Sequence, residues 1–286
     1  MSTAVILGCS SFLGSHLTGY LAGKGISVTG TYLSCKPEAP IFHAARCNLL
    51  SKADLFSLGK FDSVIHYASL VVGANKRQNN LDMMRNAVEY SNSTGARYIY
   101  ISSSQVNFDT KSDYKMSKVE SEKYIIAHSQ DYIIIRPAAP YGKLLSLRYT
   151  RKQPMHVLVD FIKKLPAVPV MGNGKYLRQP VHVDNLNELV FRCFQNAAVK
   201  NKIFDIGGPE QLAFDRIVDC IAARYQKRVF KVHLPLFIFL LAANVVKFID
   251  KENTKAVTCN EKADNSSWQA FFDIPLIPFE RGCHDL

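Results

Sequence analysis

Short runs of β-branched residues alternate with helical patterns through the first half of this 286-residue chain, and no other feature constrains its fold as strongly. Strands separated by helices pair in parallel, and the helices then cover both faces of the sheet. The expected strands are residues 3–7, 27–32, 63–67, 97–102 and 132–136, and the expected helices are 12–24, 80–93 and 113–128. The sequence therefore predicts a doubly wound α/β fold.

The pattern changes after Pro137, where prolines and glycines interrupt short elements as far as Gly174. Such interruptions indicate a smaller lobe made of loops and short helices. A helix over residues 184–196 and a strand over 203–207 return to the pattern of the main sheet. We therefore expect a main domain of residues 1–142 plus 182–207, and a discontinuous second lobe of residues 143–181 plus 208–286.

Composition limits the classes of partner. With 48% hydrophobic and 21% charged residues, the chain is not disordered, collagen-like or a coiled coil. Its formal charge is +11, but Lys and Arg are dispersed, which favours a phosphate-bearing small molecule over nucleic acid. The seven cysteines contain no C-x-x-C pair, so neither a disulfide framework nor a metal site is expected. No signal peptide is expected either, and a reducing cytoplasm is the predicted location.

The longest apolar run extends from Leu234 to Val246; lysines lie on both sides of it, and one arginine precedes it. It is too short to span a bilayer. We expect it to form part of the core or a dimer face, because it has little polar face of its own. The alternative is an interfacial helix that is attracted to anionic lipid.

A glycine-rich turn follows the first expected strand and opens directly into a helix. Small residues in such a turn let backbone N–H groups and the helix N-terminus approach a pyrophosphate. A plain βα turn without a ligand is the competing interpretation. The residues predicted to bind the cofactor here are Gly8, Ser10, Ser11, Phe12, Leu13 and Gly14.

The end of the second expected strand lacks the carboxylate that would hydrogen-bond the ribose of NAD. Tyr32 occupies the expected place, and no Asp or Glu occurs before Glu38. Ser34 and Lys36 follow, and a hydroxyl plus an ammonium could bind a ribose phosphate. We therefore predict NADP(H) as the preferred cofactor, with NAD(H) as the alternative.

A phenol and an ammonium lie four residues apart in Tyr114 and Lys118, and hence on one face of the expected helix. Three serines, Ser102 to Ser104, end the preceding strand. A nearby cation favours the phenolate form of tyrosine, which makes the phenol a usable acid and base. A serine hydroxyl can then hold the substrate oxygen. These residues predict carbonyl–alcohol chemistry.

Several motifs resemble the extended short-chain dehydrogenase/reductase family, which includes nucleotide-sugar epimerases, dehydratases and reductases on a Rossmann-like fold. The resemblance covers nearly the whole chain. Its motifs are LGCSSFLGSHL at residues 7–17, DSVIHYA at 62–68, NLDMMRNAVE at 80–89, RP at 136–137 with YG at 141–142, RQPVHVD at 178–184 and FDIGG at 204–208.

The resemblance implies roles for individual residues. Tyr114 is the acid and base, Lys118 its partner and a nicotinamide-ribose ligand, and Ser103 holds the reacting oxygen. Further implied cofactor contacts are Asn48 and Leu49 beside the adenine, together with Tyr67 and Ala68. Implied substrate contacts are Ser104 and Arg178. Arg178 would pair with the diphosphate of a nucleotide-diphosphate sugar. A homodimer is implied as well.

Three departures from the family pattern narrow the expected reaction. Ser11 replaces the middle glycine of the turn, and Asn107–Phe108 replaces a Tyr-Gly pair near the substrate. Ser104–Gln105 stands where 4,6-dehydratases carry Asp-Glu, so elimination of water is not expected. We predict an NADP(H)-linked reductase of a 4-keto nucleotide sugar. The alternatives are a 4-epimerase with retained NAD, and a non-catalytic dinucleotide-binding sensor or assembly subunit.

Overall fold

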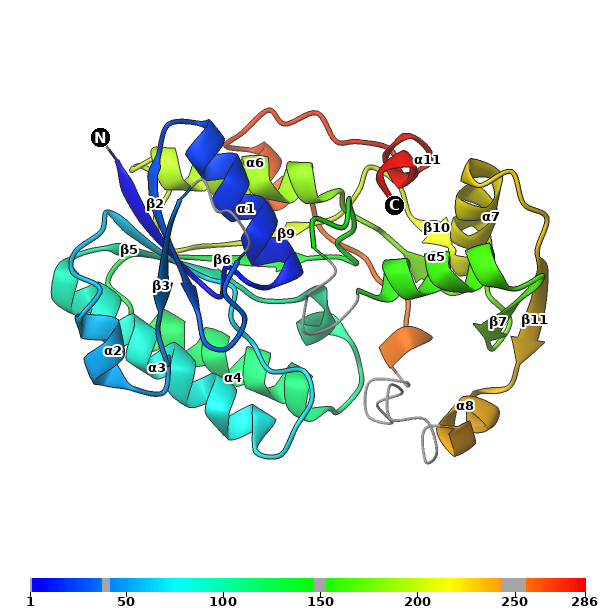
Figure 1. Ribbon diagram of the computed structural model, residues 1–286, viewed down its shortest axis with the longest axis horizontal. Coiled ribbons are helices and arrows are strands. Elements are labelled where there is room, and N and C mark those ends of the chain that lie inside the picture. Colours follow the sequence, from blue (N-terminus) through cyan, green and yellow to red (C-terminus); the bar gives the residue numbers. More distant parts are fainter. Residues whose placement is uncertain (1, 38–41, 147–152, 243–255) are drawn as a thin grey trace.

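The computed structural model describes residues 2–37, 42–146, 153–242 and 256–286, and a parallel seven-stranded sheet forms its centre (Figure 1). The strand order is β3-β2-β1-β4-β5-β6-β9. The strands are β1 (Thr3–Leu7), β2 (Ser27–Tyr32), β3 (His43–Arg46), β4 (Ser63–His66), β5 (Arg97–Ile101), β6 (Tyr132–Pro137) and β9 (Lys202–Ile206). The order reverses between β1 and β4, and this is where open α/β sheets bind ligands.

Helices cover both faces of this sheet, as the alternating pattern predicts (Figure 1). On one face α1 (Phe12–Gly23), α6 (Val183–Gln195) and α10 (Ser266–Gln269) pack on Ile6, Ile99 and Ile135. On the other face α2 (Lys52–Phe56), α3 (Lys76–Thr94) and α4 (Asp113–His128) pack on Val5, Val64 and Ile134. Successive residues of each strand thus bury opposite faces, which makes the central strands apolar throughout.

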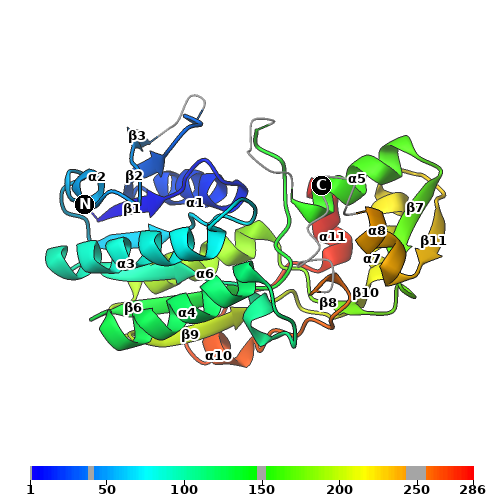
Figure 2. The same ribbon diagram turned by 90° about the horizontal axis from the view of Figure 1, so that it is seen from below.

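A smaller lobe lies beside the carboxyl ends of the strands (Figure 2). Its core packs Leu158 and Ile162 against Val168, Val170 and residues of a neighbouring helix. Its elements are α5 (Pro154–Lys164), β7 (Ala167–Met171), β8 (Leu177–Arg178), β10 (Leu212–Ala213), α7 (Phe214–Arg224), β11 (Phe230–Leu234), α8 (Leu236–Ala242), α11 (Phe279–Gly282) and the 3-10 helix η2 (Cys283–Asp285). The boundaries expected for the two domains remain a prediction.

The doubly wound fold and eight strand and helix positions of the first half agree with the sequence prediction to within a few residues. Two short elements, β3 and α2, were not predicted, because four or five residues carry too little periodic pattern. The apolar run from Leu234 to Val246 was expected to form part of the core or a dimer face. The core expectation is wrong for its described part, and the dimer face remains a prediction. Residues 236–242 form α8, in which Phe237 and Leu241 are exposed, and residues 243–246 lie outside the described residues.

Candidate active site

The turn between β1 and α1 is tightly built around two glycines. Gly8 has φ +95°, and a Cβ placed on it would lie 2.9 Å from the backbone of Ala68. A Cβ on Gly14 would lie 2.3 Å from the carbonyl oxygen of Gly8. Ser11 donates from Oγ to that same carbonyl at 2.8 Å and accepts from the N–H of Gly14 at 3.1 Å. The serine that replaces the middle glycine thus stabilises the turn instead of opening it.

The other predicted residues of this turn lie at the start of α1. Ser10 and Leu13 are half-buried, while Phe12 is buried and meets the ring of His16 edge-on at 4.9 Å. The turn therefore has the compact backbone and helix N-terminus that fit a pyrophosphate. This fit is one reason to place a dinucleotide here.

The end of β2 carries polar and basic residues from two neighbouring strands. Tyr32 ends β2 and is paired in register with Arg46, which ends β3. Ser34 and Lys36 are exposed in the following loop. Arg46 is also exposed and donates from Nε to the carbonyl of Leu33 at 3.3 Å. The sequence analysis missed Arg46, because it did not find β3 and so could not place this guanidinium beside Tyr32.

Asn48 and Leu49 lie in the turn after β3, beside the end of β2. The N–H of Asn48 donates to Asp54 at 2.9 Å, and the side chain of Asn48 accepts from the N–H of Leu50 at 3.1 Å. Leu49 is buried among the residues of the core cluster that contains α2 and α3. The turn is thus held in place at the edge of the expected adenine site.

Tyr67 and Ala68 follow β4 directly and close the other side of the glycine turn. Their N–H groups both donate to the carbonyl of Leu7, each at 2.9 Å. The Tyr67 hydroxyl is buried and has no hydrogen-bond partner among the described residues. Burial raises its pKa far above the usual tyrosine range, so it stays protonated. The carboxyl ends of β1 and β4 are therefore adjacent at the point where the strand order reverses.

Tyr114 and Lys118 lie one turn apart on α4, next to the carboxyl end of β5. Lys118 is buried and donates from Nζ to the carbonyl of Ile101 at 2.8 Å. The same Nζ lies 4.5 Å from the ring centre of Tyr100 and 5.9 Å from that of Tyr114. Burial lowers the pKa of Lys118 to about 7, against the opposing effect of the Glu122 carboxylate. The side chain can therefore change charge near neutral pH.

The three serines after β5 have different surroundings. Ser102 donates from Oγ to Glu122, which is also bound by Arg136 through two hydrogen bonds. Ser104 donates to the buried carboxylate of Glu261. Ser103 is half-buried and caps the 3-10 helix η1 (Ser104–Asn107) by accepting a backbone hydrogen bond at 3.2 Å. Ser102 and Ser104 are thus bound to carboxylates, whereas Ser103 has no carboxylate partner among the described residues.

Ser104 and Arg178, the two residues expected on the substrate side, meet at Glu261. This carboxylate comes from the loop after residue 256, is 3% exposed, and lies 3.9 Å from Nη1 of Arg178. Arg178 also donates from Nη2 to the carbonyl of Ala256 at 3.2 Å. The sequence analysis missed Glu261, because a single Glu in a loop carries no motif and its partner Ser104 is 157 residues away.

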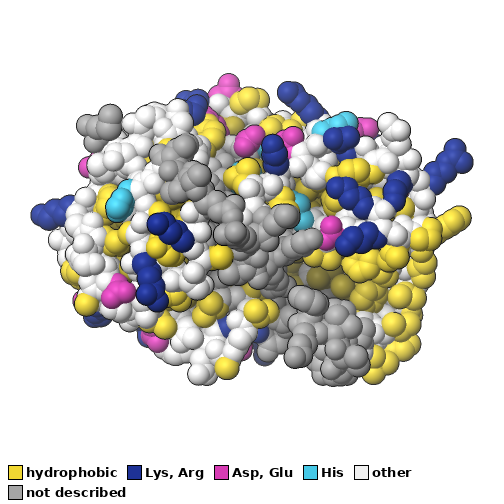
Figure 3. Space-filling view, in the orientation of Figure 1, with side chains coloured by type: hydrophobic (Ala, Val, Ile, Leu, Met, Phe, Trp, Pro, Cys, Tyr) yellow, Lys and Arg dark blue, Asp and Glu magenta, His cyan; other side chains and the backbone are white. Residues whose placement is uncertain are grey.

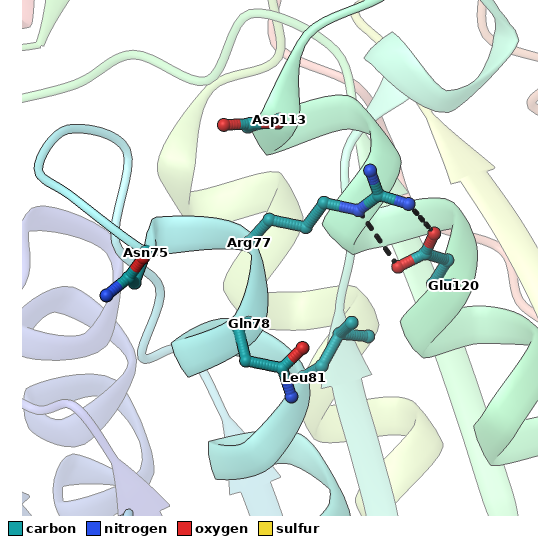
Figure 4. Close-up of a pocket in the computed structure, with 6 residues that line it drawn as sticks. All are labelled: Asn75, Arg77, Gln78, Leu81, Asp113 and Glu120. Carbon is teal, nitrogen blue, oxygen red and sulfur yellow. Dashed lines mark hydrogen bonds and ion pairs between the residues drawn. The ribbon is translucent and has the colours of Figure 1, made fainter.

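A separate hollow of about 390 Å³ lies between the N-terminal parts of α3 and α4 (Figure 4). Its lining includes Asn75, Gln78, Leu81 and the ion pair of Arg77 with Glu120. In that pair, Nε of Arg77 donates to the carboxylate at 3.2 Å, so the cation is already neutralised. The hollow is lined by helix residues and not by the strand ends, and we do not assign the chemistry to it.

Comparison with known proteins assigns the chain to a family. A family model described as NAD dependent epimerase/dehydratase matches residues 4–207. Over 164 residues the chain is 24% identical to the UDP-glucose 4-epimerase of Vibrio cholerae, covering 51% of this chain and 48% of that protein. Over 256 residues it is 20% identical to the mitochondrial NADH dehydrogenase (ubiquinone) 1 alpha subcomplex subunit 9 of Mus musculus, covering 82% and 64%. The chain thus spans about half to two thirds of these relatives.

A solved structure supports the fold over the full length. The UDP-glucose 4-epimerase of Thermotoga maritima, crystallised with UDP-glucose, superposes with a TM-score of 0.80 at 16% identity and covers 99% of this chain and 96% of that one. At this identity the likeness concerns the fold alone. Since the family model matches residues 4–207, which is well over half of the chain, the chain belongs to the NAD dependent epimerase/dehydratase family.

Proposed function

We propose that this chain transfers a hydride between a nicotinamide dinucleotide and a carbon of a nucleotide-activated sugar, and that it reduces a 4-keto sugar. The observation that carries the proposal is the group of Tyr114, Lys118 and Ser103 around the end of β5. The dinucleotide would lie over residues 1–142 plus 182–207, at the point where the strand order reverses. The sugar would bind toward residues 143–181 plus 208–286.

The side chains would divide the work as follows. A dinucleotide, when bound, would supply the hydride for the ketone carbon, and Tyr114 would donate its hydroxyl proton to the ketone oxygen. The Lys118 cation stabilises the phenolate that remains, which water then reprotonates. Ser103 donates a hydrogen bond to the reacting oxygen, because its hydroxyl is not bound to a carboxylate as those of its neighbours are.

Basic groups near the end of β2 support NADP(H) as the preferred cofactor. Arg46 is in register with Tyr32, and Lys36 and Ser34 are exposed in the adjoining loop. A guanidinium beside this strand end can donate two hydrogen bonds to the 2′-phosphate of NADP(H) at the same time. Residues 2–37 contain no Asp or Glu, so within this described stretch Tyr32 stands where a carboxylate would bind the free ribose hydroxyls of NAD.

Two other functions each have one observation in their favour. A 4-epimerase with retained NAD is favoured by the 24% identity to the Vibrio cholerae UDP-glucose 4-epimerase. A non-catalytic subunit is favoured by the longer match, at 20% identity, to a protein named as a subunit of NADH dehydrogenase. The epimerase would use the same three side chains, whereas the subunit would have no chemical need for Tyr114.

The first test identifies the cofactor. We would denature the purified protein, identify any released dinucleotide by mass spectrometry, and then titrate the emptied protein with NADPH and NADH. An empty site that prefers NADPH is the expected result, and Lys36→Ala or Arg46→Ala should weaken NADPH binding more than NADH binding. Tightly retained NAD would contradict the reductase proposal and favour the epimerase.

The second test concerns the proton donor. Tyr114→Phe should lower kcat about 100-fold or more with 4-keto nucleotide sugars, since positioned proton transfer contributes that much. Cofactor affinity should stay within about twofold, because the ring is retained. Tyr124→Phe is the matched control, as Tyr124 lies on the same helix and stacks on His128. Turnover near that of the unmodified protein in Tyr114→Phe would remove this residue from the mechanism.

A further inference from the structure

The two-stranded sheet that β7 and β11 form in the smaller lobe has one entirely apolar face. In β11 the side chains of Lys231 and His233 turn toward α7, where they bind Asp219 at 2.7 Å and Asp215 at 3.0 Å. Side chains alternate along a strand, so the other residues of β11 point the opposite way. The residues of that outer face, paired across the two strands, are Phe230 with Ala167, Val232 with Pro169 and Leu234 with Met171.

This face stays open to solvent and continues into α8. Phe230 is 77% exposed and Val232 is 42% exposed. The helix that follows, LFIFLLA, has no polar side chain, and Phe237, Ile238 and Leu241 are 37–62% exposed. In Figure 3 hydrophobic side chains gather along the edge formed by β11 and α8. We call these five exposed residues the β11–α8 surface; apolar patches of this kind mark contact sites.

Cations cluster at the end of this surface where β11 begins. Lys163 and Lys164 end α5, while Lys227 and Arg228 precede β11, and all four are exposed. The two segments touch, because Lys227 donates from Nζ to the carbonyl of Lys163. Phe230 joins them to the sheet through a 2.9 Å backbone hydrogen bond to residue 166. Within the described part of the chain, none of these four cations forms an ion pair.

We propose that the β11–α8 surface docks on an anionic membrane surface. Aromatic and aliphatic side chains would enter the boundary between headgroups and acyl chains, and the four cations would bind lipid phosphates. A second copy of this chain fits less well, since a symmetric dimer pairs this surface with itself, and neither its five apolar residues nor the four cations supply an anion. Docking here is peripheral, because no helix among the described residues is long and apolar enough to cross a bilayer.

The test is flotation of the whole protein with lipid vesicles. Unmodified protein should float with vesicles of phosphatidylcholine and phosphatidylglycerol, remain largely behind with phosphatidylcholine alone, and be released by high salt. Phe237→Ser with Leu241→Ser should lower the bound fraction at least tenfold. Lys163→Glu with Lys164→Glu should do the same, since each cation near the surface contributes strongly to binding.

Matched controls separate this surface from general effects. Leu50→Ser removes a leucine that is 45% exposed in the other lobe, and Lys60→Glu with Lys123→Glu makes the same charge change there. Both controls should float like the unmodified protein. Equal losses in the controls, or no binding to anionic vesicles at all, would overturn the proposal. A third result would also overturn it. In this result, sedimentation shows that the protein is a dimer, Phe237→Ser with Leu241→Ser dissociates the dimer, and the protein does not bind vesicles.

Discussion

Burial of Lys118 affects both the stability of the fold and the proposed reaction, because it lowers the pKa of this side chain. The residue is 2% exposed and keeps one carbonyl partner, Ile101, and the aromatic ring of Tyr100 beside it. Burial without full compensation disfavours the charged form, which lowers its pKa to about 7. A negatively charged dinucleotide or a tyrosine phenolate nearby would favour the cation again. The cost of burying this amine is therefore consistent with a role in binding and catalysis.

The pH dependence of unfolding should report this buried amine. The folded protein loses the Lys118 proton near pH 7, whereas the unfolded chain keeps it to near pH 10.5. The unfolded state thus binds more protons in this window, so the free energy of unfolding rises with pH, by on the order of a few kcal/mol. Urea unfolding of Lys118→Met between pH 6 and 10 should lack this rise, whereas the exposed-site control Lys123→Met should retain it. Parallel curves for Lys118→Met and the unmodified protein would contradict the assignment.

At the scale of elements, the turn between β1 and α1 depends on where its glycines lie. Gly14→Ala would place a methyl group 2.3 Å from the Gly8 carbonyl and should cost about 1–3 kcal/mol of stability, with weaker cofactor binding. Gly19 lies in the same helix with no other atom within 4 Å of a built Cβ. Gly19→Ala should therefore stabilise the protein by about 0.5–1 kcal/mol. Urea unfolding and calorimetric titration with NADPH would check both, and equal effects would contradict a special role for Gly14.

The long elements could be predicted from the sequence because their patterns are local. Short β-branched runs defined β1 and β2, and a helical pattern of suitable length defined α4. The four residues of β3 contain no β-branched side chain, so nothing local indicated a strand there. That element forms because the edge of β2 offers backbone partners, and this is a tertiary cause. Arg46 was missed for the same reason.

At the scale of the whole molecule, the candidate site depends on contacts between the two lobes. Tyr114 and Lys118 could be predicted because both lie within one helical turn, and the resemblance to a family assigned Ser103. Glu261 could not be predicted, because its contacts with Ser104 and Arg178 exist only once the small lobe packs beside β5. The positive charge of Arg178, which is proposed to bind the diphosphate, is thus already balanced by the Glu261 carboxylate. A ligand must compete with Glu261 for this cation.

Removal of that competing charge should strengthen the binding of a nucleoside diphosphate. Glu261→Gln keeps an acceptor for Ser104 but leaves the Arg178 cation without its carboxylate, so the affinity for UDP should rise several-fold, by about 1 kcal/mol. Arg178→Ala in the same background should abolish the gain, which calorimetric titration would measure. Glu280→Gln, at an exposed carboxylate paired with Arg216, should change nothing. If Glu261→Gln leaves UDP binding unchanged while the protein stays folded, Arg178 does not bind the diphosphate, and the carboxylate is a structural link between the lobes.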